Sequence, residues 1–118
     1  MKEENGRRIV HAVVQTRKSE VVVNKYLAKI KECVLFYLGG EEISIALFGS
    51  MAGGTVHGSS DVDIAIIPRG KWNRSKLTLL KERIEELNVP YKVDIVDFSK
   101  VSDDFRFIAL RSSVWWKQ

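Results

Sequence analysis

The sequence predicts one small α/β (α+β) domain in which a mixed sheet is flanked by helices. Three short apolar runs, at residues 43–48, 62–67 and 91–98, have the length and β-branched content of buried strands. Other segments carry apolar residues every three or four positions, which is typical of amphipathic helices. The chain has 118 residues, 45% hydrophobic and 29% charged, and this composition suits a single folded domain.

The N-terminal part of the sequence divides into an extension and the start of the domain. Residues 1–18 are expected to form an extension, because charged flanks interrupt their weak helical spacing. The domain itself is expected to occupy residues 19–118. Its first helix is predicted over residues 19–38, and the glycines at 39 and 40 end it.

Two strands and a helix that connects the second strand to the third are predicted in the middle of the chain. The run at 43–48 ends at Gly49-Ser50, and a loop rich in Gly and Ser separates it from the run at 62–67. An amphipathic helix is predicted over residues 75–87, before the third strand at 91–98. This strand–helix–strand order favours a βαβ-like unit with helices covering a small sheet.

The last part of the sequence predicts a capped helix and a short strand. Ser102 is a good N-cap residue, and two acidic residues follow it in the first turn, where the helix dipole favours them. This helix is expected to bury Phe105 and Ile108. Residues 114–116 are expected to form a final strand.

Charge and cysteine content exclude several classes of protein. Nineteen Lys and Arg against 15 Asp and Glu give a formal net charge of +4, which is too mild and too dispersed to predict a nucleic-acid-binding protein. The single cysteine, Cys33, is expected to be a small core residue, and it suits a reducing cytoplasm. The uncharged stretches are too short to span a bilayer, and we expect a cytoplasmic protein.

Three aspartates interrupt apolar strands of the predicted sheet. Asp61 and Asp63 lie two residues apart at the start of one strand, so their side chains share a face. Asp94 lies inside the next strand, and all three converge if the two strands are neighbours. Ionised carboxylates that lie close together repel one another unless a cation neutralises them. Oxygen ligands favour Mg²⁺ or Mn²⁺ over zinc.

A possible phosphate-binding turn precedes the aspartates. Gly49 and Ser50 directly follow the first strand and stand ten residues before Asp61. A glycine there allows the backbone to approach a phosphate closely, and the serine adds a hydroxyl donor. The turn is not a Walker A loop, because no Gly-Lys-Ser/Thr follows it.

The segment FGSMAGGTVHGSSDVDIAII, at residues 48–67, resembles the signature of a known superfamily. It is similar to the nucleotidyltransferases that include DNA polymerase beta and the aminoglycoside nucleotidyltransferases, and its spacing is that of the minimal nucleotidyltransferases. The looser part of the resemblance runs from about Glu20 to the C-terminus, and residues 1–18 lie outside it. The resemblance implies a polymerase-beta-like palm fold.

The resemblance also implies roles for the singled-out residues. Asp61 and Asp63 would bind two catalytic Mg²⁺ ions, and Asp94 would bind one of them and help to activate the attacking hydroxyl. Gly49 and Ser50 would hold the triphosphate of the incoming nucleotide. Compact members of the family are commonly antitoxins that transfer AMP from ATP to a tyrosine of a HEPN-type toxin, a helical ribonuclease.

One residue departs from the family pattern. Many relatives have an arginine where this sequence has Gly53, so a positive charge near the phosphates is missing. Arg69, Lys71 or Arg74 could replace it, or a partner could supply it. His57, in the same loop, is expected to face solvent.

The short chain favours dependence on a partner protein, because it lacks the second domain with which small-molecule nucleotidyltransferases bind their acceptors. Trp72, Trp115 and Trp116 are candidate contact residues, with ordinary packing as the alternative. Two other functions stay open: an aminoglycoside-like small-molecule nucleotidyltransferase, and a non-catalytic module that neutralises a toxin by binding it. We expect the chain to form a homo- or hetero-oligomer. We expect neither association with a membrane nor a direct role for nucleic acid.

Overall fold

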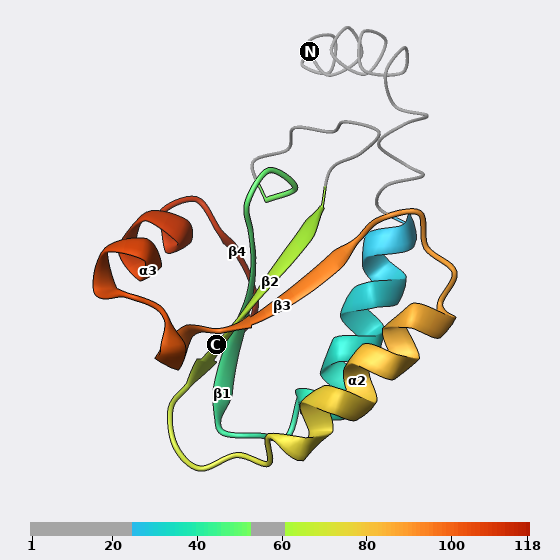
Figure 1. Cartoon of the computed structure of the whole chain (residues 1–118), viewed down its shortest axis with the longest axis horizontal. Helices are drawn as coiled ribbons and strands as arrows, with labels where there is room; N and C mark the ends of the chain where they lie inside the picture. The colour runs from blue at the N-terminus through green and yellow to red at the C-terminus, as the bar shows by residue number, and fades with distance from the viewer. Residues whose placement is uncertain (1–24, 53–60) are drawn as a thin grey trace, which may run out of the picture.

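The computed structural model describes residues 25–52 and 61–118 and shows a four-stranded sheet with helices on both faces (Figure 1). The predicted extension, the start of the first helix, His57 and Gly53 lie outside the described residues. In chain order the elements are a helix over 25–38, β1 (Ile43–Phe48), β2 (Val62–Pro68), α2 (Ser75–Glu86), β3 (Val93–Asp97), the short 3₁₀ helix η1 (Phe98–Lys100), α3 (Asp103–Leu110) and β4 (Val114–Lys117).

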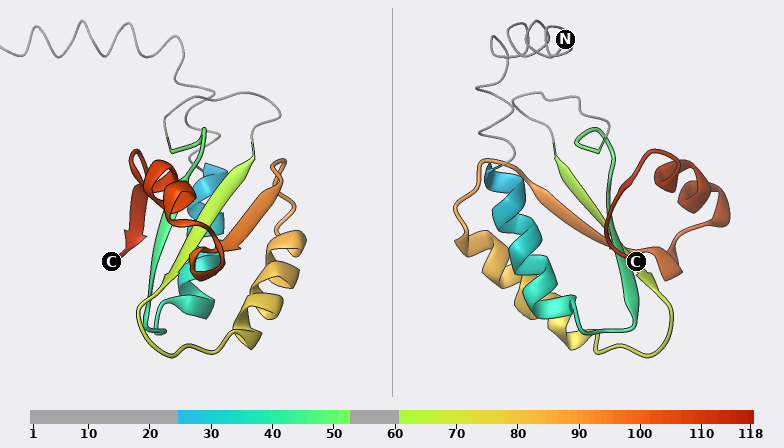
Figure 2. Two further views of the ribbon diagram at one scale, coloured as in Figure 1. Left: turned by 60° about the vertical axis from the view of Figure 1, so that its left-hand side comes forward. Right: turned by 180° about the vertical axis from the view of Figure 1, so that it is seen from behind.

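The sheet is mixed, as the sequence predicts, and its strand order is β3-β2-β1-β4. β1 pairs antiparallel with both β2 and β4, whereas β2 and β3 are parallel and are connected through α2. The helix over 25–38 and α2 cover one face of the sheet, and α3 lies against the other (Figures 1 and 2). The aspartate-bearing strands are therefore direct neighbours.

Side-chain alternation along the strands divides the core between the two faces. β1 is buried along its whole length, because strands lie on both sides of it and helices cover both faces. The main core lies under the two larger helices and includes Ile30, Val34, Leu38, Ile43, Ile45, Leu47, Val62, Ile64, Ile66, Leu80 and Ile84. The smaller core, under α3, consists of Ala46, Phe48, Ala65 and Phe98.

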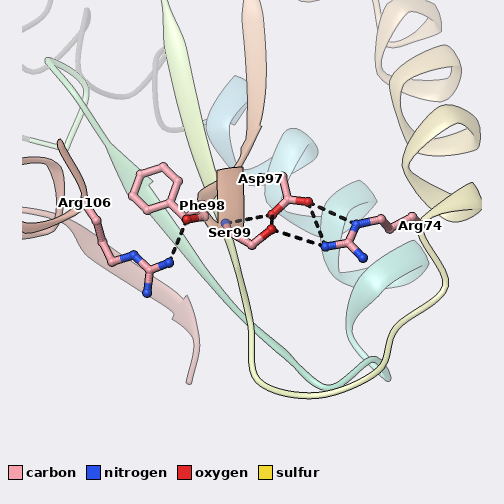
Figure 3. A network of polar contacts seen from close by, with 5 residues as sticks. All are labelled: Arg74, Asp97, Phe98, Ser99 and Arg106. Carbon is pink, nitrogen blue, oxygen red and sulfur yellow. Dashed lines mark hydrogen bonds and ion pairs between the residues drawn. The ribbon is translucent and has the colours of Figure 1, made fainter. Parts of the chain in front are cut away.

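The third strand is shorter than the predicted 91–98. β3 ends at Asp97 because the carboxylate of that residue accepts hydrogen bonds from the Ser99 backbone N–H at 2.9 Å and the Ser99 hydroxyl at 2.7 Å. These bonds turn the chain into η1 and direct Phe98 into the smaller core. Arg74 donates to Asp97 at 3.1 Å, and Arg106 donates to the Phe98 carbonyl at 2.7 Å (Figure 3). The end of β3 is thereby tied to α2 and α3.

The prediction that the last helix buries Phe105 and Ile108 is wrong. Their exposed fractions are 44% and 63%. The helix begins as predicted, with the Ser102 hydroxyl accepting a hydrogen bond from the Phe105 N–H at 3.1 Å. However, α3 is short, and its Phe105 ring packs edge-on against the Phe98 ring of the smaller core, with 5.7 Å between the two ring centres. Ala109 and Leu110, at the end of the helix, pack against the smaller core, whereas Phe107 and Ile108 face solvent. Within residues 25–52 and 61–118, the helices are too short or too polar to cross a membrane.

Candidate active site

The pairing of β2 with β3 places two of the predicted site residues side by side. Asp63 is the register partner of Asp94, and neighbours in register project from the same face of a sheet. Asp61 precedes β2 by one residue and shares that face with Asp63. All three side chains are half-buried. They lie on the α3 side of the sheet, at the edge where β1 ends and β2 and β3 begin.

The three carboxylates influence one another electrostatically. Burial raises the pKa of Asp63 above its usual value, and the negative charges of Asp94 and Asp61 raise it further. Lys92, on the same strand face as Asp94, partly offsets these effects. A cation placed among the acids would relieve the repulsion, and carboxylate oxygens are ligands that Mg²⁺ prefers. The donor chemistry therefore fits a divalent cation. In the described parts of the chain, no three His, Cys, Asp or Glu side chains are already arranged as a metal site.

Gly49 lies directly over the Asp63 carboxylate. Its φ angle of 81° is in the left-handed region, and a Cβ atom at this position would overlap Asp63 Oδ2 and lie 3.3 Å from Cγ. Only glycine satisfies both constraints without strain. The Gly49 carbonyl accepts a hydrogen bond from the Ala52 N–H at 3.2 Å, which closes a turn with Ser50 exposed at its tip. The turn predicted to bind phosphate thus adjoins the acids.

The basic residues suggested as replacements for the missing arginine lie at the wrong end of the sheet. Asp63 pairs with the last residue of β1, whereas Pro68 pairs with its first, so β2 carries Arg69, Lys71 and Arg74 away from the acids. Arg74 is also engaged by Asp97 at 3.1 Å.

Lys92 is the cation that the structure places beside the acids, and its charge acts on Asp63. The sequence places it on the same face as Asp94. Its importance emerges only from the pairing of the two strands.

The remaining candidates have mainly packing roles. Cys33 is half-buried against the main core, and burial raises the pKa of its thiol, which disfavours the nucleophilic thiolate. Trp116 and Trp72 also pack against that core, and the Arg74 guanidinium lies 5.1 Å from the Trp72 ring centre. Trp115 is 39% exposed, so it alone of the three tryptophans fits a surface contact residue.

Comparison with known proteins identifies the family. Residues 24–115 match the family model described as polymerase beta, nucleotidyltransferase. The chain belongs to this nucleotidyltransferase family. A probable protein adenylyltransferase, MntA of Haemophilus influenzae, is 34% identical over 67 residues. That match covers 57% of this chain and 59% of MntA, so it spans about three-fifths of the relative's length.

Two solved structures share the fold of the nucleotidyltransferase domain. One is a toxin-antitoxin with AMP-PNP, with a TM-score of 0.56 and 23% identity over 73% of this chain and 71% of that chain. The other is a mutant of the toxin-antitoxin MntA-HpeT, with a TM-score of 0.56 and 22% identity over 75% of this chain and 70% of that chain. The polymerase-beta-like fold expected from the sequence is confirmed.

The contact between Gly49 and Asp63 predicts a specific stability defect. Gly49→Ala should lower the free energy of unfolding by about 2 kcal/mol, because the left-handed backbone and the overlap with the carboxylate both oppose a Cβ. Adding Asp63→Ala should recover part of this loss. Urea denaturation measures each step of the double-mutant cycle.

Gly40→Ala is the matched control, because nothing lies within 4 Å of a Cβ there. It should change stability by less than about 0.5 kcal/mol. Strict additivity of Gly49→Ala and Asp63→Ala would show that the two residues do not interfere.

The crowding of the acids predicts an unusual response to charge removal. The folded state raises the pKa of Asp63, so the ionised carboxylate costs stability above its usual pKa, and this cost vanishes as the pH falls below it. In metal-free protein at pH 7–8, Asp63→Asn should therefore raise the Tm by a few degrees or leave it unchanged. The difference should shrink towards pH 4. Thermal unfolding measured by circular dichroism tests this.

Asp97→Asn is the control of opposite sign. Burial opposes ionisation of Asp97, but hydrogen bonds from Ser99 and Arg74 hold the pKa of its carboxyl below the usual value. Its ionised form stabilises the fold above the usual pKa, and this stabilisation is lost as the pH falls through the lowered pKa. Asp97→Asn should thus lower the Tm at pH 7. A large drop for Asp63→Asn as well would make Asp63 a structural hydrogen-bonding residue.

Proposed function

We propose that this chain transfers a nucleoside monophosphate, AMP from ATP, to a hydroxyl group of a partner protein and acts by this modification as an antitoxin. The observation that carries the proposal is the register of Asp63 with Asp94 beneath Gly49. It brings Asp63 and Asp94 together at the end of the sheet where the Gly49-Ser50 turn lies, with Asp61 one residue before β2. The similarity to an adenylyltransferase, MntA, supports the choice of reaction.

Each residue has a defined task in this proposal. Asp61, Asp63 and Asp94 would hold Mg²⁺, with Mn²⁺ as an alternative. When bound, the cation would neutralise phosphate oxygens and lower the pKa of the acceptor hydroxyl. Backbone N–H groups of the turn at Gly49-Ser50, together with the Ser50 hydroxyl, would bind the β- and γ-phosphates. Lys92 adds a positive charge beside the acids. The arginine that many relatives carry at the position of Gly53 is not there to supply one.

The reaction is an in-line substitution at phosphorus. Asp94 orients the acceptor hydroxyl and accepts its proton. The hydroxyl oxygen forms a bond to the α-phosphorus, the bond from that phosphorus to the bridging oxygen breaks, and pyrophosphate leaves. The product is an AMP ester of the partner protein.

The acceptor in this proposal is a tyrosine of a cognate HEPN-type toxin. The sequence resemblance implies such a partner, and two structures with the same fold are toxin-antitoxin assemblies. In the described residues, the three acids lie at the strand ends of the sheet and are partly exposed, which suits a macromolecular substrate. AMP on a catalytic or RNA-contacting tyrosine would block the toxin sterically and by its negative charge.

Labelled-nucleotide transfer tests the proposal. The chain is incubated with Mg²⁺, α-labelled ATP and the protein encoded by the adjacent gene, and label should appear on that protein. Asp61→Asn, Asp63→Asn and Asp94→Asn should each reduce transfer by about a hundredfold or more, because each removes a cation ligand or the base. Glu82→Gln, an exposed acid on α2, is the control and should transfer normally.

Two results would contradict protein adenylylation. A tight complex that silences the partner without label, and that survives the three Asn substitutions, would make the chain a binding module. If an aminoglycoside is added to the same assay and carries the label while the protein does not, the chain is a small-molecule nucleotidyltransferase.

A further inference from the structure

A groove of about 440 Å³ runs between α2 and the outer edge of β3. Lys81 and Glu85 form part of its α2 wall, and Val93 and Ile95 belong to the strand beside it. The left view of Figure 2 shows α2 beside β3, on the side away from β2. Apolar side chains in the groove and charged ones at its rim are suited to a polypeptide segment rather than to a lipid or a small ion.

The groove reaches the strand that carries Asp94, one residue of the acid cluster. Lys92 and Asp94 line it, and the charges of these same two residues act on the Asp63 carboxylate. The Asp94 side chain projects from the α3 face of the sheet, and alternate side chains of an extended segment paired along the outer side of β3 would project from that same face. Such a segment can therefore bring a hydroxyl group to Asp94, the residue proposed to accept the proton.

Within residues 25–52 and 61–118, no strand pairs with the outer side of β3, and backbone groups on that side face the groove. β3 is the outer strand of the sheet in the described part of the chain, and its inner side is joined to β2 by bonds such as Val62 N–H to the Lys92 carbonyl, at 2.8 Å. Successive residues of a strand direct their backbone groups to opposite sides. The backbone groups of Lys92 and Asp94 thus face β2, whereas the backbone N–H and C=O groups of Val93 and Ile95 face outward. Such an edge can bind an extended peptide as an additional strand.

The order of the strands places the two reactants on opposite sides of Asp63. Gly49, at the end of β1, lies against Asp63 from one side, and Asp94, on β3, flanks it from the other. Neighbouring strands are about 4.8 Å apart, so the two flanking positions are separated by roughly 10 Å. In-line substitution requires the attacking oxygen and the leaving pyrophosphate on opposite sides of the phosphorus. With the triphosphate at Gly49, the hydroxyl must approach from the β3 side.

We infer that the groove between α2 and β3 binds the acceptor segment of the partner protein. The segment lies extended along β3, pairs with the backbone of Val93 and Ile95, and presents its hydroxyl to Asp94. This inference rests on the proposed transfer to a protein hydroxyl, and it adds where and in which conformation the acceptor binds.

Filling the groove from its α2 wall tests the inference. Glu85→Trp places a large ring at an exposed position that lines the groove, so the fold is preserved while the acceptor is excluded. In Glu85→Trp, the KM of AMP transfer for the protein encoded by the adjacent gene should rise at least tenfold. The affinity for AMP-PNP and Mg²⁺ should stay unchanged. Lys81→Trp narrows the same wall and should act alike, which guards against a folding defect in one variant. Glu82→Trp, exposed on the same helix but outside the groove, should behave as wild type.

Amide hydrogen exchange provides a second readout that does not depend on turnover. Adding the partner protein should slow exchange at Val93 and Ile95, whose N–H groups become paired, and change Asp94 and Val96 less, because they already face β2. The Glu85→Trp variant should lose this protection.

The outcomes separate the inference from the proposed function. Absence of transfer by the wild-type chain would overturn both. Wild-type transfer with an unchanged KM in Glu85→Trp and Lys81→Trp would overturn the groove while leaving protein adenylylation intact. Weaker AMP-PNP binding in both variants, at unchanged KM for the partner, would assign the groove to the nucleotide and also overturn the inference.

Discussion

The parallel pairing of β2 with β3 is the constraint on which the rest of the site depends. It sets Asp63 in register with Asp94. Without it, these two carboxylates, which are distant in the sequence, would not be neighbours in space. α2 makes the pairing possible, because two parallel strands need a long crossover between them. Burial raises the pKa of Asp63, and the like charges that the pairing brings together raise it further. A cation among these carboxylates would relieve their mutual repulsion.

The main features of the site could be predicted from the sequence because they depend on local rules. Alternation along a strand places Asp61 and Asp63 on one face, and the spacing from Gly49-Ser50 to Asp61 suffices for the family resemblance. The same alternation predicts that Asp94 joins them if the strands are neighbours. That condition depends on the strand order, which the structure supplies.

Other features could not be predicted because they depend on contacts distant in sequence or on local capping. Arg69 is only six residues from Asp63, but an extended strand carries it roughly 20 Å away. β3 ends early because the Asp97 side chain accepts a hydrogen bond from the Ser99 backbone N–H. The apolar pattern of the strand does not reveal this local hydrogen bond. Helical spacing shows which residues of α3 share a face, but not that this face meets the sheet only at Phe105 and the helix end.

Mn²⁺ binding tests most directly whether the three carboxylates act as one cation site. Electron paramagnetic resonance titration in the presence of AMP-PNP reports the affinity for Mn²⁺ without any turnover. Asp63→Asn and Asp94→Asn should each weaken Mn²⁺ binding about tenfold or more, since each removes a charged oxygen ligand. Glu82→Gln should leave it unchanged. Equal affinity in wild type and both Asn variants would contradict a shared cation site at the β2–β3 edge.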